Sequence, residues 1–215
     1  MSISSLSIPD ISRMEVEEGK QVLRSTIRAH RKQRSKRMLE NYSKEWAETV
    51  LQFVGDRELV ACYVSVNKEP PTREVVEALC KAGKRVLLPK LGPGLTRAWG
   101  FYTVGDKLVE MAPGRPPEPP GEALDPAILA DVEALVIPAL ALSQRGARLG
   151  QGGGWYDRAL KKVGPNALVG AMIYPEELLV EHIPQDEMDV SVPYAIHPTA
   201  IVRTSAADES FPQFG

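Results

Sequence analysis

Apolar and polar positions recur along the chain with two periods, one typical of helices and one typical of buried strands. The first long periodic segment, 16–37, has no proline and no glycine after Gly19, which predicts a helix. Leu23 and Ile27 fall on one face of that helix. An adjoining face carries basic residues spaced by four, four and three, namely Lys20, Arg24, Arg28 and Arg31. One face can therefore pack on a core while the other meets an anion.

Shorter periodic segments follow, in which strands alternate with helices. Ser43 is expected to cap a second helix that ends at Gly55, and Thr72 a third that ends at Gly83. A further helix is expected to begin at Tyr156. Strands are expected over 58–66, 85–89, 99–104, 132–138 and 168–173, with short extended segments near 188–192 and 200–204. This alternation predicts an α/β fold with three layers (α/β/α), in which helices cover both faces of an open, mostly parallel sheet.

Composition narrows the class of protein. At 215 residues and 43% hydrophobic, the chain can bury one sizeable core, which predicts a single domain over 1–215 with frayed tails over 1–14 and 206–215. No stretch approaches the about 18 apolar residues that span a bilayer, and the first residues lack the pattern of a signal peptide. We therefore expect a cytoplasmic protein without a membrane partner. Six prolines within 113–126 predict an extended, irregular segment.

Charge is unevenly distributed although the chain carries only −2 overall. Residues 1–37 hold nine Lys and Arg against four Asp and Glu, so this segment carries +5 and the remainder −7. The basic residues are confined to one predicted helix without aromatic residues, which disfavours nucleic-acid binding. The three histidines lack partners at triad or metal spacing, and Cys62 and Cys80 lack them at metal spacing. We expect structural or surface histidines and buried free thiols.

The glycine-rich segment 146–158 is the most informative part of the chain, reading Gly-Ala-Arg-Leu-Gly-Gln-Gly-Gly-Gly-Trp-Tyr-Asp-Arg. Glycines allow positive φ angles and bring backbone N–H groups close to a ligand. The segment lies between a predicted strand and a predicted helix, where open α/β sheets bind ligands. It lacks the Lys-Ser/Thr ending of a P-loop and the spacing G-x-G-x-x-G. A flexible turn is the alternative, but the arginines and aspartate within the segment favour a phosphate site.

Five separated motifs carry a family resemblance. They are Lys20-Gln-Val-Leu-Arg24, Tyr63-Val-Ser-Val-Asn-Lys-Glu-Pro-Pro-Thr72, Gly83-Lys-Arg-Val-Leu-Leu-Pro89, Gly114-Arg-Pro-Pro-Glu-Pro119 and the glycine-rich segment up to Asp157. Together they resemble the motifs of the 5-formyltetrahydrofolate cyclo-ligase family. The resemblance spans residues 20–204. Gln151 departs from the family's usual Tyr or Arg, and Trp155 stands where Tyr is frequent.

The resemblance implies an ATP-dependent reaction. ATP phosphorylates the formyl oxygen of 5-formyltetrahydrofolate, N10 attacks the activated carbon, and phosphate departs to leave 5,10-methenyltetrahydrofolate and ADP, with Mg²⁺ required. Phosphoryl transfer depends on positioning and charge neutralisation more than on a protein nucleophile. Two alternatives remain, since fold does not fix chemistry. One is a sugar-phosphate isomerase-like or acyl-transfer enzyme, and the other is a module of the same fold that binds nucleotide or folate without turnover.

The resemblance also implies a role for each site residue. It assigns catalysis to Arg148 and Tyr156, and metal binding to Asp157 and Asp189, with Asp186 as an alternative to Asp189. It assigns ATP binding to Lys20, Arg24, Arg148, Leu149, Gly150, Gln151, Gly152, Gly153, Gly154, Trp155 and Tyr156. It assigns folate binding to Val64, Glu69, Gln151, Gly152, Gly153, Gly154 and Trp155. We expect a monomer that acts on these small molecules alone.

Overall fold

The computed structural model describes residues 5–111, 115–179, 182–207 and 214. Its centre is a seven-stranded sheet in the order β10-β9-β7-β4-β1-β2-β3. The strands are β1 (Leu59–Ala61), β2 (Arg85–Leu91), β3 (Arg97–Tyr102), β4 (Ala134–Pro138), β7 (Leu168–Met172), β9 (Tyr194–Ile196) and β10 (Ile201–Arg203). Neighbouring strands are parallel except at the two edges, where β3 pairs antiparallel with β2 and β10 with β9. The predicted open, mostly parallel sheet is confirmed.

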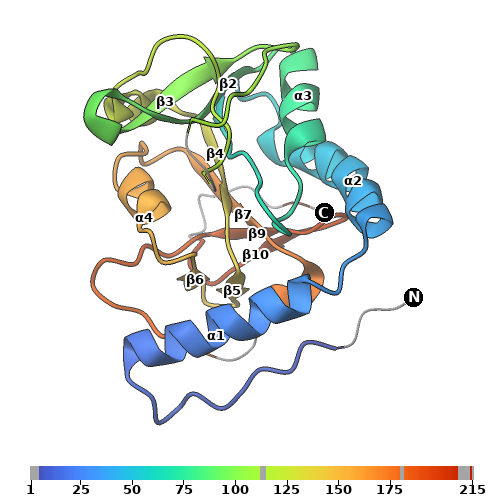
Figure 1. Cartoon of the computed structure of the whole chain (residues 1–215), viewed down its shortest axis with the longest axis vertical. Helices are drawn as coiled ribbons and strands as arrows, with labels where there is room; N and C mark the ends of the chain where they lie inside the picture. Colours follow the sequence, from blue (N-terminus) through green and yellow to red (C-terminus); the bar gives the residue numbers. More distant parts are fainter. Residues whose placement is uncertain (1–4, 112–114, 180–181, 208–213, 215) are drawn as a thin grey trace.

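Helices cover both faces of this sheet (Figure 1), α2 (Lys36–Val54) and α3 (Arg73–Lys81) on one face, and α4 (Trp155–Leu160) and the 3-10 helix η2 (Pro126–Asp131) on the other. Successive strand residues point to opposite faces, so Val136 packs in the cluster with α2 and α3, whereas Leu135 and Ile137 pack in the cluster with η2 and α4. The three-layer prediction is therefore confirmed.

The first helix, α1 (Val16–Arg31), lies outside these layers and crosses one end of the molecule (Figure 1). Its apolar residues Leu23 and Ile27 are buried against a small second sheet, together with side chains from the segment that precedes the helix. That sheet consists of β5 (Ala141–Ser143), β6 (Arg148–Leu149) and β8 (Leu178–Leu179). These short strands were not predicted from the sequence. The remaining 3-10 helices are η1 (Pro93–Leu95) and η3 (Pro175–Glu177).

The predicted first helix is too long, because α1 ends at Arg31 and α2 begins only five residues later. Ser35, rather than the predicted Ser43, caps α2 by accepting a hydrogen bond from the Met38 N–H at 3.3 Å. Ser43 is buried within α2. The break lies beside Arg34, whose guanidinium stacks 3.5 Å from the ring centre of Tyr174. This contact joins positions 140 residues apart, so local periodicity could not reveal it.

Four other features differ from the predictions. The strand expected over 58–66 is regular only over β1, and Thr72 stands at the start of α3 without capping it. Its hydroxyl accepts a hydrogen bond from the Ser65 N–H at 2.9 Å instead. Residues 188–192 form no strand, since the strand in this region is β9. The helix expected to begin at Tyr156 begins at Trp155.

Other predictions about local structure stand. The described part of 113–126 is irregular, apart from η2 at its end and isolated bridges from Glu118 to Val109 and from Leu124 to Trp99. Cys62 is a buried free thiol as predicted, whereas Cys80 is a free thiol that is only partly buried.

Within the described residues, no helix is both long and apolar enough to cross a membrane.

Candidate ligand site at the carboxyl edge of the sheet

A cavity of about 460 Å³ opens at the carboxyl ends of the central strands. After β1 the chain passes to β2 on one side, while β4 lies on the other side of β1. Such a reversal of strand order leaves a crevice at the carboxyl ends of the two strands, where open α/β sheets bind ligands. Tyr63, just beyond β1, and Pro138, at the end of β4, both line the cavity. The fold therefore places the cavity where ligand binding is expected.

The glycine-rich loop forms one wall of this cavity. It is shorter than predicted, because Arg148 and Leu149 belong to β6, and the hairpin of β5 and β6 separates it from β4. Gly152 and Gly154 have φ angles of +100° and +60°, which residues with a Cβ rarely adopt. A Cβ added at Gly153 would meet no atom within 4 Å. The loop thus combines left-handed turns with an open backbone that a ligand can approach.

Lys20 reaches the cavity from α1 and is only 4% exposed. Its Nζ lies 2.7 Å from Oδ2 of Asp186 and 2.5 Å from Oδ2 of Asp189. Burial opposes the charge on Lys20, but hydrogen bonds to the two carboxylates outweigh it and raise the pKa of the lysine. The Lys20 hydrogen bond is also the main cause that lowers the pKa of Asp186. Lys20 is therefore a firmly held cation.

Arg148 and Arg24 also pair with acidic side chains. Nη2 of Arg148 lies 2.8 Å from both carboxylate oxygens of Asp157, and Nη1 donates to the Pro138 carbonyl at 3.3 Å. Nε of Arg148 is buried and has no hydrogen-bond partner among the described residues. Arg24 donates from Nη1 to Glu17 at 2.7 Å and from Nε to the Gly150 carbonyl at 3.1 Å. Each cation predicted to bind phosphate is thus paired with a carboxylate of the same cavity.

Opposite charges balance across the cavity lining. The lining cations are Lys20, Arg24, Arg148, Arg158 and Lys161, and the lining carboxylates are Glu17, Glu69, Asp157, Asp186 and Asp189. No group of three or more His, Cys, Asp or Glu among the described residues is arranged to hold a metal ion. Mg²⁺ commonly takes only one or two carboxylates together with substrate phosphates and water. The oxygen donors of Asp157 and Asp189 fit that chemistry, and the metal assignment stays a prediction.

Glu69 lies in the segment between β1 and α3 and is 8% exposed. Its Oε2 accepts a hydrogen bond from the Val66 N–H at 3.0 Å, and its Oε1 accepts one from Nε2 of Gln151 at 3.1 Å. Burial raises the pKa of Glu69, and these hydrogen bonds oppose part of that rise. Val64 lines the same cavity and is partly buried. The site therefore contains both a desolvated carboxyl group and an apolar side chain.

The two aromatic residues after the glycines also line the cavity. Burial raises the pKa of Tyr156 well above its usual value, which keeps its hydroxyl protonated at neutral pH. The Arg97 guanidinium lies 5.5 Å from the ring centre of Trp155. Tyr156 can therefore donate a hydrogen bond to a ligand, and Trp155 contacts an arginine of β3.

All the residues that the sequence predicted for binding, catalysis or metal ligation line this one cavity. Their placement together agrees with a shared site, and their individual roles stay predictions. The lining also includes residues that were not predicted, namely Glu17, Tyr63, Val66, Pro116, Pro138, Ala139, Arg158, Lys161 and Met188. A signal existed for Glu17, which stands one helical turn before Lys20. His30 and His197 are buried and His182 is exposed, away from this lining.

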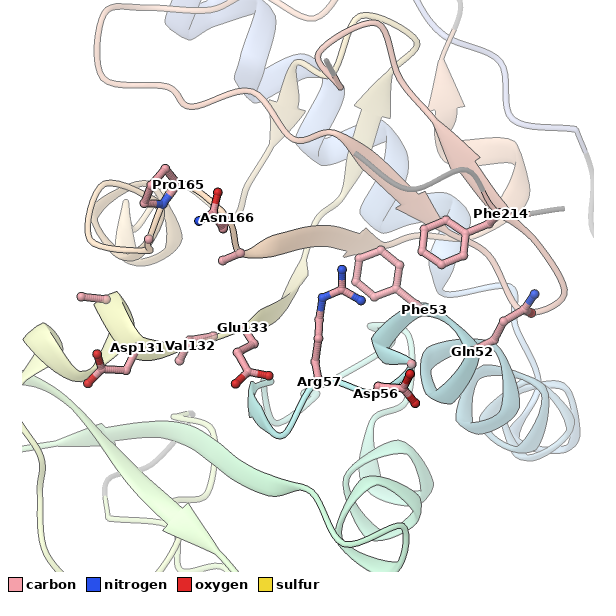
Figure 2. Close-up of a pocket in the computed structure, with 14 residues that line it drawn as sticks. Gln52, Phe53, Asp56, Arg57, Asp131, Val132, Glu133, Pro165, Asn166 and Phe214 are labelled. Carbon is pink, nitrogen blue, oxygen red and sulfur yellow. The ribbon is translucent and has the colours of Figure 1, made fainter. Parts of the chain in front are cut away.

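A second cavity, of about 670 Å³, lies at the opposite, amino edge of the sheet (Figure 2). Figure 2 shows Arg57 between Phe53 and Glu133. Nη1 of Arg57 donates to the Val54 carbonyl at 3.2 Å, and the Glu133 carboxylate accepts a hydrogen bond from the Glu58 N–H at 2.7 Å. None of the residues predicted for the site lines it.

The fold and the carboxyl-edge cavity define an α/β protein whose ligand site combines paired charges with a glycine-rich loop. The chain belongs to the 5-formyltetrahydrofolate cyclo-ligase family, because the sequence model of that family matches residues 16–198. It is 35% identical over 144 residues to 5-formyltetrahydrofolate cyclo-ligase of Mycolicibacterium smegmatis, covering 65% of this chain and 73% of that protein. It is 33% identical over 144 residues to the Escherichia coli K12 enzyme of the same name, covering 66% of this chain and 79% of that protein.

Solved structures agree with this membership. The structure of Aquifex aeolicus 5,10-methenyltetrahydrofolate synthetase matches with a TM-score of 0.72 and 25% identity, over 90% of this chain and 96% of that one. A 5,10-methenyltetrahydrofolate synthetase from Mycoplasma pneumoniae matches in fold, with a TM-score of 0.62 at 18% identity, over 82% and 97%. The predicted family and the prediction that the protein is an enzyme are therefore confirmed.

Proposed function

We propose that the protein converts 5-formyltetrahydrofolate into 5,10-methenyltetrahydrofolate and releases ADP and phosphate from ATP in a Mg²⁺-dependent reaction. Family membership supports the cyclo-ligase activity. One observation carries the finer statement: the glycine-rich loop, the cations Lys20, Arg24 and Arg148, and the buried carboxyl group of Glu69 all line the same cavity. Such a cavity suits a polyphosphate and a polar heterocycle bound side by side.

The proposed reaction has two steps. The γ-phosphoryl group leaves the β-phosphate oxygen of ATP and bonds to the formyl oxygen of the folate. N10 then attacks the formyl carbon and loses its proton, while the bond between that carbon and the phosphorylated oxygen breaks and phosphate departs. Neither step requires a protein nucleophile, so catalysis rests on positioning and on neutralising the phosphate charge.

Arg148, Lys20 and Arg24 are suited to that neutralisation. Arg148 lines the cavity, holds Asp157 through Nη2, and has an Nε that is buried and without a hydrogen-bond partner among the described residues. Lys20 and Arg24 approach from α1, and Arg24 also donates to a carbonyl of the glycine-rich loop. Tyr156 stays protonated and adds a neutral donor. These groups act in a buried site, where charge interactions are stronger than in water.

Glu69 and Val64 are suited to hold the folate. Each carboxylate oxygen of Glu69 accepts one hydrogen bond from the protein and keeps a further lone pair for an N–H group of the pterin. Val64 offers an apolar surface in the same cavity. Removal of Glu69 would then weaken folate binding without affecting nucleotide binding.

Asp157 and Asp189 are the residues that would hold Mg²⁺, whose chemistry is to neutralise charge on phosphate oxygens. Both carboxylates now pair with cations, Asp157 with Arg148 and Asp189 with Lys20. A change of partner by these two carboxylates would free both cations for the phosphates. Bound metal is therefore expected to increase the affinity for nucleotide, and bound nucleotide the affinity for metal.

The test is a spectroscopic assay of purified protein with 5-formyltetrahydrofolate, ATP and MgCl₂. Methenyltetrahydrofolate should form only when all three are present, and ADP should appear in equal amount. Folate binding without product under any of these conditions would favour the alternative, a binding protein of the same fold.

We also propose that the enzyme is a cytoplasmic monomer without nucleic-acid or membrane partners. A mass of one chain by light scattering would support the monomer.

A further inference from the structure

Gln151 connects three distant parts of the chain through one side-chain amide. Its Oε1 accepts hydrogen bonds from Nε of Arg28 at 3.1 Å and from Nη2 of Arg28 at 2.7 Å. Its Nε2 donates to Oε1 of Glu69 at 3.1 Å. Nη2 of Arg28 also donates to the backbone carbonyl of Gln151 at 3.2 Å. The contacts form a relay from α1 through the glycine-rich loop to the segment after β1.

The chemistry of an amide suits this position. An amide presents an acceptor at one end and donors at the other while carrying no charge. In the relay its acceptor faces the Arg28 cation and its donor faces the Glu69 carboxylate. A carboxylate at position 151 would repel Glu69, and a cation would repel Arg28. Glutamine therefore satisfies both neighbours, which neither an acidic nor a basic side chain can do.

The relay fixes the orientation of the Glu69 carboxylate. One oxygen of Glu69 is held within its own segment by the Val66 N–H, and the other is held only by Gln151 among the described residues. Arg28 is exposed and is not among the described residues that line the cavity. Its influence on the site therefore passes through Gln151, which Arg28 holds at both the side chain and the backbone.

We propose that Arg28 and Gln151 are positioning residues that orient Glu69 toward the folate and hold the glycine-rich loop against α1. This inference rests on the proposed role of the cavity in folate binding. It adds Arg28 to the residues that determine folate affinity, although Arg28 need not touch the folate. It also gives Gln151 a role defined by its amide rather than by direct contact with ATP.

The test compares Gln151→Ala, Arg28→Ala and the double variant, with Arg37→Ala as an exposed-arginine control. Direct titration measures the folate dissociation constant without ATP, and steady-state assays measure KM for each substrate. Each single variant should weaken folate binding about five- to tenfold, the scale of a typical intramolecular hydrogen bond, with a smaller change in the KM for ATP. The double variant should match Gln151→Ala, because the two residues act in series.

Gln151→Glu provides a readout that loss of folding would not mimic. It keeps the size of the side chain but sets a second carboxylate against Glu69, so folate binding at neutral pH should be weaker than in Gln151→Ala. Acidification should restore part of it, since one shared proton removes the repulsion. Gln52→Glu, an exposed position on α2, is the matched control and should follow the wild-type pH profile.

The outcomes separate this inference from the proposed function. Wild-type folate affinity in both Arg28→Ala and Gln151→Ala, or a wild-type pH profile in Gln151→Glu, would overturn the relay while leaving the enzyme activity intact. Wild-type protein that binds folate but never turns it over would contradict the proposed reaction alone, because the dissociation constants still test the relay. Wild-type protein that binds no folate would overturn both.

Discussion

Two of the protein's cavities lie at opposite edges of one sheet and differ in what their charged side chains do. The amino-edge cavity is the larger, about 670 Å³ against about 460 Å³. Its Arg57 and Glu133 form hydrogen bonds to nearby backbone groups. At the carboxyl edge, Lys20 and Arg148 pair with carboxylates that line the same cavity. Charged groups thus bind backbone atoms at one edge and pair with one another around a cavity at the other.

The difference indicates that convergence of side chains identifies a site better than volume does. Lys20 and Asp189 are 169 positions apart in the chain, and Gln151 and Glu69 are 82 apart. Bringing charged groups out of water is costly unless they are paired or used. The fold gathers five cations and five carboxylates around one cavity. Interactions with a charged ligand in that cavity can offset the free energy lost when these groups leave water. The following variants test this comparison by changing equivalent residues at the two edges.

Replacement of one arginine at each edge should give the largest difference in turnover between the two cavities. Arg148→Ala should lower turnover about 10³-fold, the scale of an arginine that stabilises a transferring phosphoryl group. The matched variant Arg57→Ala, at the amino edge, should change turnover less than twofold. Rates of methenyltetrahydrofolate formation at saturating substrates measure both. Equal losses in the two variants would remove the distinction between the edges.

Replacement of an aspartate should give the next largest difference. Asp157→Ala should lower turnover about 100-fold at limiting Mg²⁺ through loss of charge neutralisation, while the protein stays folded by circular dichroism. Direct titration should also show weaker binding of Mn²⁺ in the presence of an ATP analogue. Asp131→Ala, from the amino-edge cavity, serves as the control. Normal turnover of Asp157→Ala at limiting Mg²⁺ would rule out the metal assignment.

Replacement of one glutamate at each edge should give a smaller difference, which affects folate binding but not ATP binding. Glu69→Ala should weaken apparent folate affinity by about 1–3 kcal/mol, the cost of losing a buried polar contact, and should leave the KM for ATP unchanged. Glu133→Ala removes an acceptor for the Glu58 N–H and should lower stability without changing either KM. Initial rates over a range of folate concentrations, with thermal unfolding in parallel, make the comparison. An unchanged folate KM in Glu69→Ala would leave that residue an ordinary loop side chain.

Features carried by local sequence could be predicted. The glycine-rich segment placed Arg148 and Asp157 close together in the chain, and the structure pairs them at 2.8 Å. Apolar periodicity predicted the main strands along the chain and the three layers, although not the order of the strands in the sheet. Position in the family's motifs, rather than any physical pattern, pointed to Glu69. What could be predicted was therefore either periodic along the chain or compressed into one short motif.

Features that depend on distant contacts could not be predicted. The end of α1 at Arg31 accompanies a pair with the buried Glu177, 146 positions away. Strands β6 and β8 contain only two residues each, too few to show a period, and they pack beneath α1. The link from Lys20 to Asp186 and Asp189 has no signature in either segment. Tertiary contacts, rather than local preference, decide these features.

The smallest expected effect is on pH dependence, and it refines the contrast between the two glutamates. Because burial raises the pKa of Glu69 above the ordinary value of 4.5, its carboxylate takes up a proton earlier as the solution is acidified. Protonation removes the charged acceptor, so folate KM should rise as pH falls through that raised pKa. The side chain of the Glu69→Gln variant cannot take up a proton, so its folate KM should be high and independent of pH over the same range.

The ratio of wild-type to variant KM cancels the titration of the folate itself. Glu133→Gln should keep the wild-type dependence of folate KM on pH. A ratio that does not change with pH would mean that the Glu69 carboxylate is not the group that binds the folate.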